Sequence, residues 1–148
     1  MLWAAVEVRS FGVEGQLDIR DTEPGRAMLA ARDPAGFAAV ISESILAINE
    51  PVAGVWSAAM GAAQGDRDAT DLLGERIATI RTQVERVLEI VADRGWLRTD
   101  VPFDDLVETA CVITSAETYV RFVLIDGKSR DAYRDFVART IRDTILVR

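Results

Sequence analysis

Apolar positions recur every three or four residues along most of this chain, which is the period of an amphipathic α-helix. The stretch from Ala110 to Leu124, ACVITSAETYVRFVL, departs from that pattern, because it carries only one glutamate and one arginine. A helix that is apolar on nearly every side has to be buried on nearly every side. In a chain of 148 residues, a second copy of the chain is the simplest cover for the outer side. The pattern therefore predicts a helical dimer.

The same periodicity predicts three helices in the first half of the chain. One is expected at residues 2–13, followed by a loop at 14–34 that holds a short helical turn. Asp33-Pro34 pairs an N-cap acid with a proline suited to the first helical position, so it opens the second helix. The residue before a proline is disfavoured in a helix. We therefore expect Pro51 to end the second helix and to begin a third at 51–63.

Three further helices are predicted in the second half. The first covers 66–94 and ends at Gly95, where a left-handed residue suits a glycine. The others are expected at 103–125 and 129–147, and no segment alternates with the period of two that marks a strand. The expected fold is an all-α bundle of about six helices in a single domain, residues 1–148.

Composition excludes several classes of function. The formal net charge of −7 argues against nonspecific binding to nucleic acid or to an anionic membrane. The chain has no histidine, the commonest general base near neutral pH and the commonest transition-metal ligand. The acids Asp66, Asp68 and Asp71 lack the glycine and final glutamate of a calcium loop, and capping of a helix start explains them. We expect no enzyme, no metal and no cofactor.

The expected location is the cytoplasm. Cys111 is the single cysteine, so it cannot form an internal disulfide, and its apolar setting suits a core residue better than a reactive thiol. Glu7 and Arg9 interrupt the first apolar run too early for a signal peptide. No stretch approaches the roughly 18 apolar residues of a membrane span.

Six short motifs follow one another in an informative order. They are Asp33-Pro34, INEPVAGVW at 48–56, Ala62-Ala63 followed by Asp66, RGWLR at 94–98, ITSAETY at 113–119, and Gly127-Lys128-Ser129 followed by Tyr133 and Phe136. In this order they resemble the C-terminal domain of TetR-family transcriptional regulators, over residues 2–147. The resemblance implies a transcriptional repressor that senses a small, mostly apolar molecule and forms a homodimer through its last two helices.

The resemblance has one departure. Family members begin with a three-helix, helix-turn-helix head that reads DNA, and no segment of this sequence offers one. The sequence is therefore expected not to bind DNA by itself. A fragment, a start codon assigned too late and a natural headless relative are the alternatives, of which we favour the first two.

The resemblance also implies an effector pocket. Its ligand-binding residues would be Phe37, Ile41, Ile45, Trp56, Met60, Val84, Val87 and Glu117. Ordinary core packing is the alternative for each of them. Oriented polar groups in such a pocket could come from Ser44, Asn49, Gln83 and Glu117. A buried Glu117 would need a partner: Arg121 one turn later, a ligand amine, or an arginine across the dimer.

The implied dimer interface involves the last two predicted helices. Its candidate residues are Val107, Cys111, Thr114, Tyr119, Tyr133, Val137, Ile141 and Thr144. A structural homodimerisation module, with a filled core and no effector, is the alternative function. A cavity bordered by Trp56, Met60 and Val84 would favour sensing, whereas solid packing there would favour the structural module.

Overall fold

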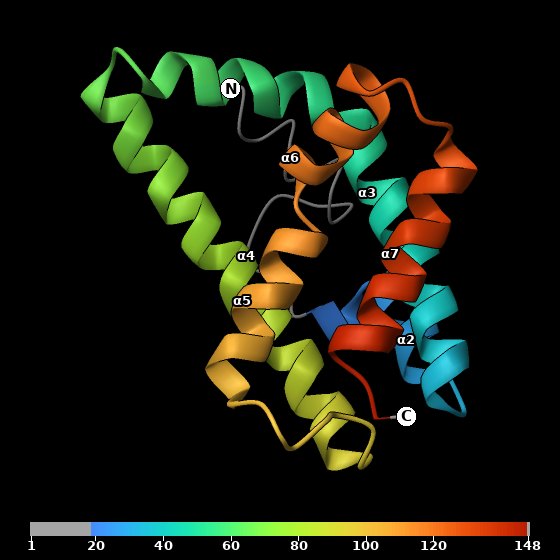
Figure 1. Ribbon diagram of the computed structural model, residues 1–148. Helices are drawn as coiled ribbons and strands as arrows, with labels where there is room; N and C mark the ends of the chain where they lie inside the picture. Colours follow the sequence, from blue (N-terminus) through green and yellow to red (C-terminus); the bar gives the residue numbers. More distant parts are fainter. Residues whose placement is uncertain (1–18, 148) are drawn as a thin grey trace.

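The computed structural model describes residues 19–147, and this range is predominantly helical (Figure 1). The elements are a 3₁₀ turn η1 (Ile19–Asp21), the α-helices α2 (Glu23–Leu29), α3 (Pro34–Ala63), α4 (Arg67–Asp93), α5 (Phe103–Ile113) and α6 (Ala116–Tyr119), a π-helical segment η2 (Val120–Ile125), and α7 (Arg130–Thr144). Within this range there is no strand, only an isolated β-bridge between Leu97 and Leu146. The predicted all-α fold of about six helices is confirmed. The helix predicted at 2–13 lies outside the described residues.

Local signals correctly placed the starts of α3 and α4 and the end of α4. Asp33 caps α3, because its Oδ1 accepts a hydrogen bond from the backbone N–H of Gly36 at 2.7 Å. Asp66 caps α4 in the same way, accepting from the N–H groups of Asp68 and Ala69. Gly95 follows α4 with φ +69°, the left-handed conformation that a glycine adopts without strain.

The predicted break at Pro51 is wrong, because α3 continues through it. Leu46 and Asn49 before the proline are buried, and so are Val52 and Trp56 after it. Packing of both halves onto the same body of the protein offsets the backbone hydrogen bond that a proline cannot make. The two halves of α3 run in different directions (Figure 1), as expected for a helix that bends near a proline.

The helix predicted at 103–125 is wrong in the opposite sense, because it is interrupted. α5 ends at Ile113, and a new helix starts after Ser115, whose Oγ accepts a hydrogen bond from the backbone N–H of Thr118 at 3.1 Å. The carbonyl groups of Thr114 and Ser115 both accept hydrogen bonds from the Asn49 side chain on α3. A partner 65 residues away thus stabilises a break that the local sequence does not show.

The last predicted helix ends early. α7 stops at Thr144, and the chain then runs beside the segment that follows α4. The N–H of Arg98 donates to the carbonyl of Ile145 at 3.1 Å, and the N–H of Val147 donates to that of Trp96 at 2.8 Å. These two backbone hydrogen bonds replace the helical ones and tie the end of the chain to the end of α4.

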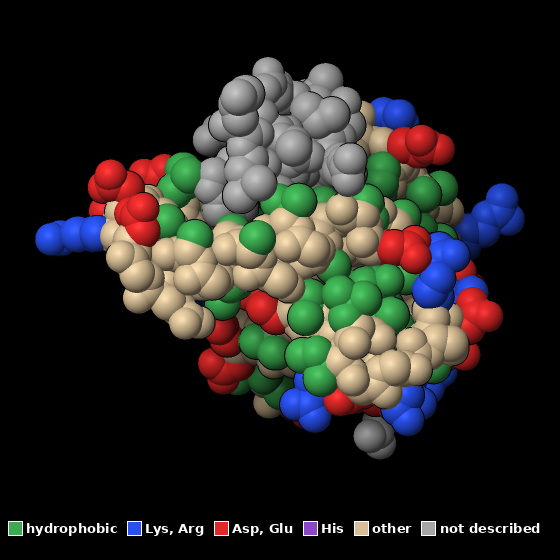
Figure 2. Space-filling model, turned by 90° about the horizontal axis from the view of Figure 1, so that it is seen from above, with side chains coloured by type: hydrophobic (Ala, Val, Ile, Leu, Met, Phe, Trp, Pro, Cys, Tyr) green, Lys and Arg blue, Asp and Glu red, His purple; other side chains and the backbone are tan. Residues whose placement is uncertain are grey.

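The segment η2 leaves large apolar side chains in solvent. Leu124 is 57% exposed and Ile125 is 69% exposed. Figure 2 views the molecule from the end at which α6 and η2 lie, and it shows hydrophobic side chains gathered on this face. The apolar stretch 110–124 is therefore only partly covered by the other residues of the range 19–147.

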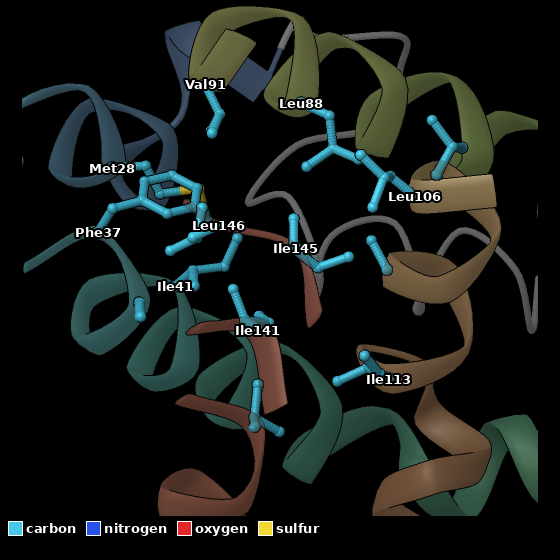
Figure 3. Packing of buried hydrophobic residues seen from close by; sticks show 14 of the residues in the cluster. Met28, Phe37, Ile41, Leu88, Val91, Leu106, Ile113, Ile141, Ile145 and Leu146 are labelled. Carbon is cyan, nitrogen blue, oxygen red and sulfur yellow. The ribbon is translucent and has the colours of Figure 1, made fainter. Parts of the chain in front are cut away.

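The core lies between α3, α4, α5 and α7. In Figure 3, Met28, Phe37 and Ile41 lie near Leu146 at one side of the core, while side chains such as Ile145 extend toward the other. α7 packs against α3 and also against α5. The fully buried apolar side chains of this core include Val91 of α4, Leu106 and Val107 of α5, and Tyr133 and Val137 of α7.

Five predicted dimer-interface residues belong to this core, where the chain itself covers them. They are Val107, Tyr119, Tyr133, Val137 and Ile141, each between 0% and 3% exposed in the single chain. A helix face that is apolar in the sequence can be covered by the chain itself as well as by a partner, and periodicity does not distinguish the two. The other three predicted interface residues, Cys111, Thr114 and Thr144, are half-buried.

α3 also corrects the expectation about membrane spans. By length and composition it is apolar enough to cross a membrane, and it is the one such helix among the described residues. In its most apolar window, 44% of the residues are buried inside the protein. Core helices that never meet a membrane pass the same test, so length and composition carry little weight here.

Candidate functional site

A cavity of about 720 Å³ lies between α3, α4 and the stretch from α5 to η2. Its wall is mostly apolar. α3 contributes residues at successive helical turns, including Ile41, Ile45 and Trp56, and α4 contributes Ile80 and Val84 in the same way. Cavities that hold drug-sized ligands have volumes of roughly 300–1,000 Å³, with apolar walls and a few polar groups. The cavity therefore has the size and the surface of a small-molecule site.

The structure brings seven of the eight predicted pocket residues to this wall. They are Phe37, Ile41, Ile45, Trp56, Val84, Val87 and Glu117. Met60 does not line the cavity. It lies one turn after Trp56 near the end of α3 and is 36% exposed.

Sequence reasoning did not assign several wall residues to the pocket. Ile77 and Ile80 belong to the apolar stripe of α4, so the spacing from Val84 could have indicated them. Phe122 and Phe136 also line the cavity, and their rings stack with centroids 5.0 Å apart. The two come from η2 and α7, and no local pattern reveals that they meet.

Asn49 lines the cavity, but its amide is already engaged. The Nδ2 group donates to the carbonyl of Thr114 at 2.9 Å, to that of Ser115 at 3.1 Å and to the hydroxyl of Tyr133 at 3.0 Å. Asn49 is 4% exposed, so water does not compete for these contacts. Among the polar pocket candidates, Asn49 therefore shapes the wall by holding the end of α5 and the start of α6 against α3.

Tyr133 completes this arrangement from α7. Burial raises the pKa of Tyr133 to about 12, and the hydrogen bond from Asn49 partly counteracts that rise. The hydroxyl is therefore neutral at every physiological pH. Its ring packs edge-on against Tyr119 with centroids 5.0 Å apart, which fixes α6 relative to α7.

The other polar pocket candidates differ from one another. Ser44 does not line the cavity among the described residues, and its hydroxyl donates to the carbonyl of Val40 on its own helix at 2.9 Å. Gln83 and Glu117 do line it. The hydroxyls of Thr109, Thr114 and Thr118 bond to backbone carbonyls, as expected for threonines in helices.

Of the three partners considered for Glu117, Arg121 is engaged elsewhere. The Nε of Arg121 donates to both carboxylate oxygens of Asp126, at 2.9 and 3.0 Å, across the turn that ends η2. Within residues 19–147, the hydrogen bonds and ion pairs leave the half-buried carboxylate of Glu117 unengaged. A carboxylate in the wall of a mostly apolar cavity is thus available to a ligand.

Cys111 lines the same cavity as a free, half-buried thiol. Burial raises its pKa, although the charge of Arg81 acts in the opposite direction. A thiol with a raised pKa is mostly protonated near neutral pH and is a weak nucleophile. Cys111 therefore contributes apolar surface to the wall.

Together the fold and the cavity define an all-α protein with a large, mostly apolar and partly open site. Comparison with known proteins adds no family to this description. No protein-family model, no curated protein and no solved structure matches the chain.

Proposed function

We propose that this chain binds a small, mostly apolar molecule in the cavity, and that it is the effector-sensing domain of a TetR-like transcriptional repressor in the cytoplasm. The observation that carries the binding proposal is the cavity of about 720 Å³ itself. Protein interiors are usually packed as densely as organic crystals, with few voids larger than a water molecule. A helical module selected only for stability would gain contacts by filling this space, so the cavity favours sensing over the filled-core alternative.

The wall of the cavity has the construction that a ligand-dependent switch needs. α3 and α4 are long continuous helices, whereas the opposite wall is broken at Thr114 and Ser115. A ligand that contacts both sides would favour the arrangement of α6 and η2 that fits it best. The ligand would shift the equilibrium between the preferred arrangement and the ligand-free one by the difference between its binding free energies for the two. In a regulator with DNA-reading heads, this conformational shift would alter the spacing of the heads.

We propose in addition that the chain forms a homodimer. The support is the apolar stretch 110–124, of which Val112 and Leu124 remain exposed at 60% and 57%, together with the neighbouring Ile125. In this proposal Val112, Leu124 and Ile125 contribute to the dimer interface, because five of the residues predicted for it lie in the core of the single chain. Sedimentation equilibrium tests the proposal, since a dimer has twice the 16.2 kDa mass of the chain.

The binding proposal is tested by filling the cavity. 1-Octanol serves as a small apolar probe, and isothermal titration calorimetry measures its binding to the wild type and to Val84→Trp. Because Val84 lines the cavity, the added indole occupies the space of the probe. Ile125→Trp adds the same group on the surface and is the matched control.

We expect Val84→Trp to lose binding while it keeps its helical circular dichroism, and Ile125→Trp to bind like the wild type. Equal binding by all three proteins would place the probe elsewhere and contradict the proposal. A wild type that binds no octanol would contradict it as well.

A further inference from the structure

The charges in the cavity wall narrow the class of ligand. Two of the acids that line it are Glu108 and Glu117. Glu108 is neutralised, because the Nη1 of Arg81 donates to its Oε2 at 2.5 Å. Glu117, half-buried in the first turn of α6, takes part in none of the ion pairs of the described chain. Its negative charge is the one that the wall leaves open.

The arginines that line the cavity are engaged by other groups. Arg81 contacts Glu85 at 3.2 Å in addition to Glu108, and Arg121 is held by Asp126. Arg76 is engaged as well. An anionic ligand would have to compete with these partners, whereas a cationic ligand meets a carboxylate that has none within residues 19–147.

The hydroxyl groups beside Glu117 do not satisfy it either. The Oγ1 of Thr118 donates to the carbonyl of Val112 at 2.6 Å, and the Oγ of Ser115 is within 3.0 Å of the same carbonyl. The Oγ1 of Thr114 donates to the carbonyl of Ala110. The hydrogen-bond donors of this part of the wall are thus used within the chain, so a ligand that donates to Glu117 competes with water and not with these side chains.

Aromatic rings complete the surroundings. Trp56, buried on α3, lines the cavity and packs in one cluster with Ala116, the residue next to Glu117. Phe122, which follows Glu117 in the sequence, also lines the cavity. The faces of aromatic rings attract cations, and this attraction grows when water is excluded. A cavity whose wall carries both a carboxylate and aromatic rings is a suitable site for an ammonium group.

From this arrangement we infer that the cavity takes a cationic amphiphile, with its ammonium group at Glu117 and its apolar body between α3 and α4. The inference rests on the proposed function, since it names the chemical class of the ligand for the same cavity. The apolar wall supplies most of the affinity, and Glu117 supplies the preference for a positive charge. The net charge of −7 also favours the approach of a cation.

Three probes with the same eight-carbon chain test this inference: octylammonium, 1-octanol and octyl sulfate, titrated calorimetrically below micelle-forming concentrations. We expect the wild type to bind the ammonium probe most tightly and the sulfate most weakly. Glu117→Gln, which keeps the size of the side chain, should weaken ammonium binding about tenfold, a change typical of losing one charge-assisted contact. It should leave octanol binding unchanged, and Glu117→Asp should retain the preference for the cation.

Glu89→Gln is the matched control. Glu89 is exposed on α4 and does not line the cavity, so this variant removes the same charge without changing the wall. Its binding profile should equal that of the wild type. A loss of ammonium binding as large as that of Glu117→Gln would assign the preference to net charge and overturn the inference.

The remaining outcomes separate the inference from the function on which it rests. Octanol binding with no preference for the ammonium probe would overturn the inference and leave the apolar cavity as a binding site. So would an equal weakening of all three probes in Glu117→Gln. Absence of binding by every probe would overturn the proposed function and the inference together.

Discussion

The side chain of Asn49 should control the stability of the break between α5 and α6. It is 4% exposed and donates to two backbone carbonyls and to the Tyr133 hydroxyl, at 2.9, 3.1 and 3.0 Å. Two N–H groups therefore serve three acceptors: the buried Tyr133 hydroxyl and two partly buried carbonyls. Asn49→Ala removes both donors and leaves the acceptors without a replacement from α3.

The size of the effect follows from the net value of these contacts. Each buried hydrogen bond contributes ~1 kcal/mol, and each acceptor left unsatisfied adds a cost of the same order. We expect Asn49→Ala to lower the free energy of unfolding by ~3 kcal/mol, with a fall in Tm of roughly 10 °C for a domain of this size. Asn49→Asp should be at least as damaging at neutral pH, because a carboxylate would then face two carbonyl oxygens.

Urea unfolding, followed by circular dichroism at 222 nm, measures the change. Ser44→Ala is the control, since the Ser44 hydroxyl is also buried but donates only to Val40 within its own helix. Its loss should cost ~1 kcal/mol or less. If Asn49→Asp unfolds at the same urea concentration as the wild type, the account of the break as a feature held from α3 is wrong.

Three further predictions concern other parts of the molecule. Burial raises the pKa of Tyr133 from an ordinary value of 10 to about 12. The folded chain therefore keeps a proton that the unfolded chain loses, so stability is full below pH 10 and falls by up to ~3 kcal/mol as the pH rises towards 12. Urea titrations at pH 9 and 11 should show a larger fall in the wild type than in Tyr133→Phe, in which the raised pKa values of Tyr119 and Cys111 account for the remaining fall. Asp66→Ala should destabilise by ~1 kcal/mol through loss of the α4 cap, measured by thermal unfolding, and an unchanged Tm would contradict that role. Ile125→Glu should shift the sedimentation equilibrium towards monomer if η2 contributes to a homodimer, whereas an unchanged dimer would exclude η2 from the interface.

The sequence predicted those features of the fold that depend on neighbouring residues. The caps at Asp33 and Asp66 and the left-handed Gly95 each involve groups within a few positions, so the local pattern was sufficient. The continuation of α3 through Pro51 and the break after Ile113 depend on contacts between distant segments. The Asn49 contacts cross 65 residues, and no local rule contains them.

The candidate site was predicted in part for the same reason. Trp56, Val84 and the other pocket residues on α3 and α4 follow helical spacing, and spacing was enough to place them on one wall. Spacing did not reveal that the faces carrying Tyr133 and Val137 are covered by the chain itself. Helical spacing also suggested Arg121 as a candidate ion-pair partner of Glu117. In the structure, the turn after η2 brings Asp126 within hydrogen-bond distance of Arg121.

Intermolecular nuclear Overhauser effects between bound 1-octanol and the methyl groups of the protein test the central claim most directly. The claim is that a small apolar molecule binds inside the cavity. We predict contacts from the probe to the methyl groups of Ile45, Ile80 and Val84, which line the cavity from two helices, and none to those of Leu124 and Ile125 on the surface. Contacts confined to Leu124 and Ile125, with none to the cavity residues, would contradict the account.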